Sequence, residues 1–182
     1  AYYFFGFGLF LTSLVFVPGI QMYHGGAHRW IHIGSFSVQP SELLKFVFII
    51  VVAMWCTKYG QYFKTIKYGL LPYLGFVGVV ALIMLAQPDF GTFLIMLAGS
   101  FVVYFVGGAS FKHIGLLLAT GILGFLLLIS VRPYMMERVL TFFDATHDVK
   151  GSSWQLNQSL IAVGSGRVFG RGYGQSVQKY NY

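Results

Sequence analysis

The chain has 182 residues, of which 57% are hydrophobic and 9% charged, and its mean hydropathy is +0.71. A soluble domain carries roughly a quarter charged residues, so this composition excludes an ordinary soluble protein and indicates an integral membrane protein. The net charge of +7 is spread over the loops without a basic run. It therefore favours membrane lipids or an anionic membrane substrate as partners, and not nucleic acid.

Long apolar runs predict an all-α fold, a polytopic transmembrane helical bundle. A membrane helix needs about 20 apolar residues, and the alternation typical of a membrane barrel is absent. Prolines and glycines near several run ends are the expected helix terminators. In chain order, we expect spans over residues 2–17, 43–57, 70–86, 90–106 and 114–131.

The predicted spans form a single membrane domain over residues 1–182. Because Ala1 already stands inside an apolar run and no closing helix follows residue 175, we expect an internal segment of a longer protein. Residues 132–182 form a long predicted loop. Within it, Trp154–Val163 has helical periodicity, with Ser153 as a suitable N-cap and Gly164 as its end.

Alternation of the spans places two short loops on one side of the membrane. These loops are rich in lysine and contain no acidic residue, so the positive-inside rule places them in the cytoplasm. The motif-bearing loops then face the outer side. The cytoplasmic lysines are Lys58, Lys64, Lys67 and Lys112.

The polar segment 26–45 separates the first two spans and contains Arg29 and Trp30. Trp favours the membrane interface and Arg favours phosphate, so this pair is an ordinary feature of a membrane surface. The functional alternative is recognition of a lipid-linked phosphate, which a guanidinium binds through two donors. The residue types alone leave both interpretations open.

The second span opens with Gln39, Ser41, Glu42 and Lys45. Ser41 is predicted as its N-cap, Glu42 suits the helix dipole, and Glu42 can pair with Lys45 three residues later. The Lys45 ammonium opposes the dipole, so a helix start alone explains it less well. These charges mark either an interfacial helix start or a site for a charged ligand.

Asp89 lies in the short connection between the third and fourth spans. An N-cap of the fourth helix explains it, although a carboxylate near membrane depth is unusual. His24, His28 and His32 are four residues apart and could bind a metal on a helix, but the surrounding glycines argue against a helix there.

Six islands of sequence, in this order, resemble the SEDS family, the FtsW, RodA and SpoVE membrane proteins of bacterial cell-wall synthesis. One departure is Arg167, which stands where the family usually has glycine. The matching islands are GAHRWI at 26–31, FSVQPSELLK at 36–45, QPDFGT at 87–92, RVLTF at 138–142 with Asp144, QLNQSLIAVGSG at 155–166, and FGRGYGQ at 169–175 with Gln178 and Lys179.

The resemblance implies a peptidoglycan glycosyltransferase of the bacterial cytoplasmic membrane. Such an enzyme polymerises lipid II into glycan strands together with a class B penicillin-binding transpeptidase. The family's catalytic aspartate follows a Pro-Glu pair, and we expect it beyond Tyr182. A lipid II flippase and a non-catalytic scaffold of the cell-wall synthesis complex are the alternatives.

The resemblance also assigns roles to residues of this chain. Arg29, Lys45 and Arg138 would bind the leaving pyrophosphate, and Trp30 would hold a sugar or the lipid neck. A divalent cation at the pyrophosphate stays open, although the sequence holds no ligand set that establishes one. The residues expected to line or brace the cavity are Gln39, Ser41, Glu42, Asp89, Gln158 and Ser159.

Overall fold

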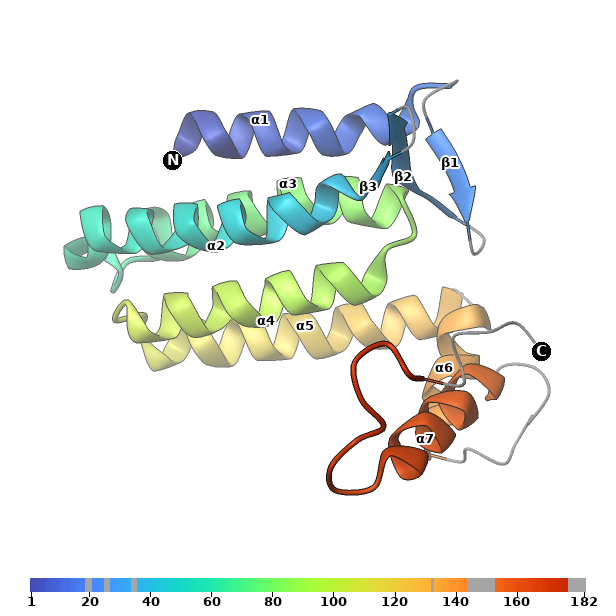
Figure 1. The fold of residues 1–182 in the computed structure, drawn as a ribbon. Coiled ribbons are helices and arrows are strands. Elements are labelled where there is room, and N and C mark those ends of the chain that lie inside the picture. Colours follow the sequence, from blue (N-terminus) through green and yellow to red (C-terminus); the bar gives the residue numbers. More distant parts are fainter. Residues whose placement is uncertain (19–20, 25–26, 34–35, 132, 144–152, 177–182) are drawn as a thin grey trace. The chain divides into compact units, whose positions relative to one another are not determined.

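The computed structural model describes residues 1–18, 21–24, 27–33, 36–131, 133–143 and 153–176 (Figure 1). Its contacts divide the chain into two compact units, Ala1–Leu117 and Leu118–Tyr182. The elements are α1 (Tyr2–Ser13), η1 (Leu14–Phe16), β1 (Gln21–His24), β2 (Ala27–Ile33), β3 (Phe36–Val38), α2 (Pro40–Tyr59), η2 (Gly60–Tyr62), η3 (Ile66–Leu70), α3 (Leu71–Ala86), α4 (Phe90–Val106), α5 (Phe111–Val131), α6 (Pro133–Phe143) and α7 (Trp154–Gly166).

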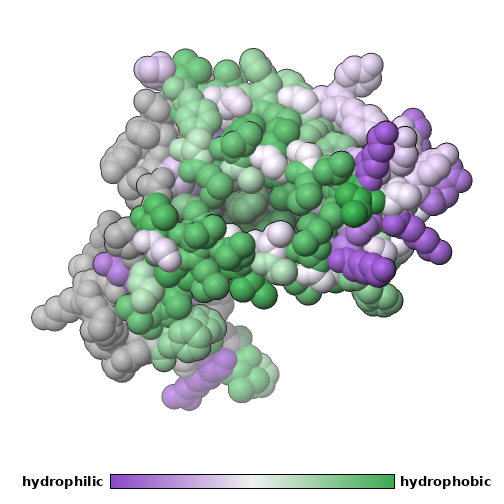
Figure 2. All heavy atoms as spheres, turned by 180° about the vertical axis from the view of Figure 1, so that it is seen from behind, coloured by the Kyte–Doolittle hydropathy of each residue, from purple (hydrophilic) through white to green (hydrophobic). Residues whose placement is uncertain are grey.

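The α-helical membrane fold is confirmed. Among the described residues, three helical segments are long and apolar enough to cross a membrane, and two further apolar helices, Tyr2–Phe16 and Phe90–Val106, are shorter. Their outer surface is largely hydrophobic in the view of Figure 2, as expected for side chains that face lipid. The three long segments are Pro40–Tyr62, Ile66–Ala86 and Phe111–Val131.

Helix α2 lies at the centre of the first unit and contacts both α1 and α4. Glycines on the neighbouring helices allow this close packing, as is common in membrane bundles. A Cβ atom at Gly8 of α1 would lie 3.1 Å from Leu44, and one at Gly99 of α4 would lie 2.8 Å from Ile49. The apolar side of α2 therefore forms the middle of the core.

Aromatic rings and two buried polar pairs connect α3, α4 and α5 within the first unit. The rings of Tyr73 and Tyr104 stack with centroids 4.4 Å apart. The Tyr73 hydroxyl lies 3.1 Å from Ser100 Oγ, and the Tyr104 hydroxyl lies 3.1 Å from His113 Nδ1. Each buried hydroxyl thus has a hydrogen-bond partner, which offsets the cost of removing it from water.

The segment after α1 contains a small sheet that the sequence analysis missed. Its strand order is β1-β2-β3, and both pairings are antiparallel. Strand β2 contacts η1 and the start of α2, so the sheet lies at one end of the helices (Figure 1). Polar residues and glycines obscured the strand pattern, which is weak in short strands.

The second unit contains more helix than predicted. Helix α6 was missed, and α7 continues three residues beyond Val163, so Gly164 does not end it. Ser153 does precede α7, but its side chain does not cap the helix. The Ser153 hydroxyl lies 3.5 Å from Thr141 Oγ1 instead, which joins α7 to α6 within this unit.

The connection between α2 and α3 is packed into the first unit. Phe63 is fully buried, with its ring centroid 4.6 Å from Trp55 and 5.3 Å from Tyr104. Gly69 passes directly over Phe63, and a Cβ atom at Gly69 would lie 2.6 Å from the Phe63 carbonyl oxygen. Only glycine fits at this position without a shift of backbone.

We therefore expect Gly69→Ala to destabilise the protein by about 1 to 3 kcal/mol, because the clash is with backbone that cannot rotate away. Gly78→Ala in α3 is the matched control, since nothing lies within 4 Å of its Cβ position. The control should be neutral or slightly stabilising. Thermal unfolding of the full-length protein in detergent measures both, and equal midpoints would contradict the packing argument.

Candidate functional site

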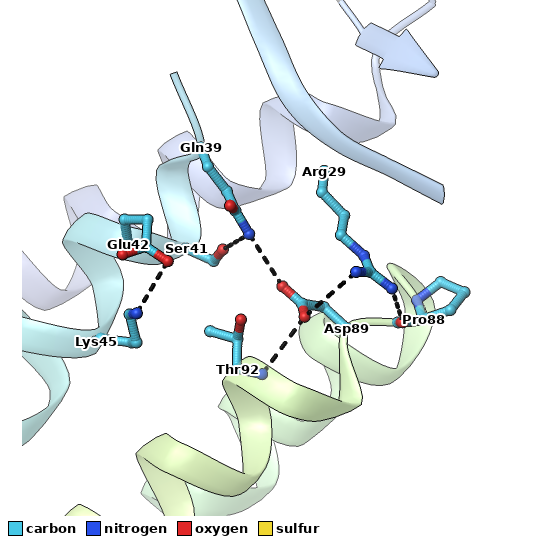
Figure 3. A network of polar contacts seen from close by, with 8 residues as sticks. All are labelled: Arg29, Gln39, Ser41, Glu42, Lys45, Pro88, Asp89 and Thr92. Carbon is cyan, nitrogen blue, oxygen red and sulfur yellow. Dashed lines mark hydrogen bonds and ion pairs between the residues drawn. The ribbon is translucent and has the colours of Figure 1, made fainter. Parts of the chain in front are cut away.

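A network of polar side chains lies where the sheet, the start of α2 and the turn between α3 and α4 meet (Figure 3). It contains Arg29 from β2, Gln39 and Ser41 at the start of α2, and Asp89 and Thr92 at the start of α4. These residues come from three separate islands of the sequence. The fold therefore joins residues that the sequence analysis could only consider one motif at a time.

Arg29 occupies an irregular position in the sheet. The register pairs Trp30 with Met22 and His28 with Tyr23, so Arg29 is an extra residue of β2 without a partner in β1. Such a bulge redirects a side chain. In Figure 3 the Arg29 guanidinium points to the α3–α4 turn, where Nη2 donates a hydrogen bond to the Pro88 carbonyl oxygen.

Asp89 is the hub of the network. Its Oδ1 accepts a hydrogen bond from the Thr92 backbone N–H at 3.4 Å, which confirms its predicted role as the N-cap of α4. Its Oδ2 accepts one from Gln39 Nε2 at 3.3 Å. Arg29 Nη1 lies 3.8 Å from Oδ1, an ion pair too long for a hydrogen bond. The Asp89 side chain is only 5% exposed, so the carboxylate needs these partners.

Gln39 connects the start of α2 to this carboxylate. Its amide nitrogen also donates to Ser41 Oγ at 3.0 Å. The prediction that Ser41 caps α2 is wrong, because the N-cap is Gln39 and Pro40 occupies the first helical turn. Proline suits that position since its missing N–H would have no helical partner there. The buried Ser41 hydroxyl therefore serves the network instead.

The predicted pair of Glu42 and Lys45 is confirmed. Lys45 Nζ lies 2.9 Å from Glu42 Oε1 on the first turns of α2. The lysine side chain is 23% exposed and the glutamate side chain 53% exposed. The pair is therefore partly solvated. Glu42 holds Lys45 near the start of α2, and the free energy of such a pair is small.

Two contributors to this region, Gln87 and Thr92, are not among the predicted site residues. The buried Gln87 donates from Nε2 to the Thr12 carbonyl oxygen at 2.7 Å, which connects the end of α3 to the end of α1. Thr92 supplies the backbone N–H that Asp89 caps. A capping aspartate predicts a donor three residues later, whereas nothing in the sequence signals the Gln87 contact.

The remaining predicted site residues are Trp30, Arg138, Gln158 and Ser159. Trp30 is the neighbour of Arg29 on β2 and is partly buried. Arg138 lies on α6, and its side chain is outside the described residues. Gln158 and Ser159 lie on α7 in the second unit, partly buried and exposed respectively. Their place in a common site stays a prediction.

The donor set of this network does not fit a divalent cation. Mg²⁺ and similar ions bind several oxygen ligands, whereas both carboxylates here, Asp89 and Glu42, already pair with cationic side chains. Among the described residues, no three His, Cys, Asp or Glu side chains gather as a metal site. His24, His28 and His32 lie on strands, so the helical arrangement considered for them is absent.

A family model described as "cell cycle protein", which covers FtsW, RodA and SpoVE, matches residues 1–182. The chain belongs to the FtsW/RodA/SpoVE family. The resemblance carried by the six sequence islands is thereby confirmed.

Two curated members of the family show the level of similarity. Stage V sporulation protein E of Bacillus subtilis is 39% identical over 173 residues, which cover 95% of this chain and 47% of that protein. A probable peptidoglycan glycosyltransferase FtsW of Allochromatium vinosum is 40% identical over 179 residues, which cover 96% and 45%. The chain thus spans under half the length of these relatives.

Two solved structures have the same fold. A chain of a peptidoglycan synthase complex has a TM-score of 0.67 and 31% identity, over 89% of this chain and 47% of that chain. RodA of Thermus thermophilus has a TM-score of 0.55 and 32% identity, over 67% and 40%. These similarities support a multi-pass membrane protein of the FtsW/RodA/SpoVE type.

The network predicts that substitution of Asp89 lowers the stability of the protein substantially. Asp89→Ala should destabilise the protein by about 2 to 4 kcal/mol, because the α4 cap, the Gln39 contact and the Arg29 ion pair are lost together. Asp89→Asn should cost less, since asparagine also caps helices. The measurement is the midpoint of thermal unfolding of the full-length protein in detergent.

Glu42→Gln is the matched control, because it removes a carboxylate from a partly solvated pair. Its cost should stay below about 1 kcal/mol. If Asp89→Ala is no more destabilising than Glu42→Gln, Asp89 is not the hub of the network.

Proposed function

We propose that this chain is part of a peptidoglycan glycosyltransferase that polymerises lipid II in the bacterial cytoplasmic membrane. Relatives named as probable peptidoglycan glycosyltransferases and the fold of a peptidoglycan synthase chain support the proposal. The observation that carries it is the position of Arg29 and Lys45. Two cations stand at the polar end of an apolar helical bundle, and charged side chains close to membrane depth support a substrate site there.

The reaction requires positive charge at one defined place. A sugar hydroxyl oxygen of the acceptor forms a bond to the anomeric carbon of the donor chain. The bond between that carbon and the undecaprenyl pyrophosphate oxygen breaks, and the electron pair leaves with the pyrophosphate. A base accepts the hydroxyl proton. Cationic side chains that contact the departing phosphate oxygens would stabilise the charge that develops there.

The Arg29 guanidinium can serve this purpose without leaving Asp89 unsatisfied. Its contact with the carboxylate is long, at 3.8 Å, and the hydrogen bond from Nη2 goes to the Pro88 carbonyl oxygen and not to Asp89. If the guanidinium turns to a phosphate, Asp89 keeps the donors Gln39 Nε2 and the Thr92 N–H. We infer that Asp89 holds Arg29 in place before the pyrophosphate binds.

Lys45, on the first turns of α2, is paired in a similar way. Its ammonium contacts a glutamate that is more than half exposed and that water can solvate once the lysine moves. Exposed pairs of this kind are worth little in free energy, so an anionic ligand can replace the carboxylate. Arg29 and Lys45 are therefore the proposed pyrophosphate ligands, with Trp30 against a sugar or the lipid neck.

Asp89 is not the proposed base. It is nearly fully buried, it caps α4, and a guanidinium and an amide contact its oxygens. We propose that the base lies beyond Tyr182 in the longer protein, as the family resemblance implies. Arg138, Gln158 and Ser159 stay proposed substrate contacts, and a class B penicillin-binding transpeptidase stays the proposed partner.

The proposal predicts a selective loss of polymerisation. Arg29→Ala and Lys45→Ala in the full-length protein should each lower the rate of glycan synthesis from lipid II by about tenfold or more, since each removes a charged contact to the leaving group. Gel analysis of glycan chains made by purified protein at equal amounts measures this. Wild-type rates in both variants would rule out the assignment.

Arg167→Gly is the matched control. It also removes a positive charge, but from an exposed residue after α7 whose φ of +51° favours glycine. We expect wild-type polymerisation from this variant. Synthesis in detergent also separates the enzyme from a lipid II flippase, because no transport is possible there. A wild-type protein that moves lipid II in vesicles but makes no glycan in detergent would favour the flippase.

A further inference from the structure

The end of the first unit opposite the sheet carries a cluster of lysines. Two segments form this end, the α2–α3 connection and the turn between α4 and α5 (Figure 1). A Cβ atom at Gly60 would lie 3.7 Å from the Gly107 carbonyl oxygen, so the two segments are in contact. We name the cluster the lysine platform; it consists of Lys58, Lys64, Lys67 and Lys112.

The lysine platform has one sign of charge and is accessible. All four side chains are exposed, and the ion pairs of the described residues do not involve them. The segments 58–70 and 107–113 contain no Asp or Glu. Hydrophilic residues gather at this end of the molecule in Figure 2, beside the hydrophobic surface of the helices. The platform therefore presents a positive potential next to a lipid-facing wall.

Aromatic and apolar side chains surround the lysines. Tyr59, Tyr62 and Tyr68 are exposed, and Lys58 and Lys67 lie over the rings of Tyr59 and Tyr68 at 5.3 and 5.5 Å. Tyrosines are typical of the headgroup level of a membrane, where one end of the ring is wet and the other is not. This surface is therefore suited to the boundary between lipid tails and phosphate headgroups.

The platform is also preformed. Phe63 anchors the connection under Trp55 and Tyr104, and Gly69 closes over Phe63. The Thr65 hydroxyl donates to the Tyr62 carbonyl oxygen at 2.8 Å and fixes the turn between Lys64 and Lys67. A surface that needs little ordering loses less conformational entropy when a ligand binds.

We propose that the lysine platform binds the phosphate headgroups of anionic phospholipids in preference to neutral ones. An acidic segment of another protein would also match the charge. The lipid is favoured because the lysines lie at the ends of membrane-spanning helices and are bordered by exposed tyrosines and by the exposed apolar side chains of Ile66 and Phe111. This inference does not depend on the proposed enzymatic activity.

The test uses the full-length protein in phosphatidylcholine vesicles with a trace of spin-labelled lipid. The fraction of motionally restricted label reports lipid in contact with the protein, for phosphatidylglycerol and for phosphatidylcholine separately. Each lysine near an anionic surface raises the association constant for that surface by about fivefold. We therefore expect the wild-type protein to associate with labelled phosphatidylglycerol about fivefold or more strongly than with labelled phosphatidylcholine. The preference should fall in high salt.

Two matched variants assign the preference to the platform. Changing all four lysines to glutamine should make the motionally restricted fractions of the two labelled lipids nearly equal. Changing all four to arginine should retain the preference for phosphatidylglycerol. The positions are exposed, so both variants should keep the wild-type helical circular dichroism. Parity in the wild type, or an unchanged preference in the glutamine variant, would overturn the proposal. The first outcome would point to an acidic protein segment instead.

Discussion

The structure depends on one buried carboxylate. Asp89 lies between two apolar helices, and removing its charge from water would be costly without compensation. Three different elements supply the compensation: the α4 backbone at Thr92, the α2 entrance through Gln39, and the β2 strand through Arg29. Because each partner comes from a different segment, satisfying this group also fixes the sheet and two helices relative to one another at the polar end of the first unit.

The contact of Arg29 with Asp89 differs from a typical pair of arginine and carboxylate. A short, bidentate contact between arginine and carboxylate is strong and would keep the guanidinium in place. Here the contact is long, the guanidinium donates its hydrogen bond to the Pro88 carbonyl oxygen instead, and the aspartate has other donors. The first unit thus combines an apolar core around α2 with a polar end whose ion pairs are long or partly solvated. This division agrees with membership of a family whose curated relatives include probable peptidoglycan glycosyltransferases.

Much of this was predictable from the sequence, for identifiable reasons. The helices followed from apolar runs and their terminators, and α4 was predicted with the observed bounds because Asp89 marks its start and Gly107 its end. The Glu42–Lys45 pair followed from helical spacing. The contact of Arg29 with Asp89 joins residues sixty positions apart, which no local pattern encodes. The three short strands likewise depend on tertiary contacts. The start of α2 at Pro40, one residue before the predicted cap Ser41, follows from the backbone chemistry of proline.

The bulge at Arg29 has a consequence for how this segment tolerates change. Side chains alternate between the two faces of a strand, so one extra residue reverses the alternation for everything that follows it. Deleting His28 would let Arg29 pair with Tyr23, which would make the register regular and would turn Arg29 away from the α3–α4 turn. A substitution at a neighbouring position would leave that geometry intact. The number of residues in this strand is therefore as much a part of the site as their identity.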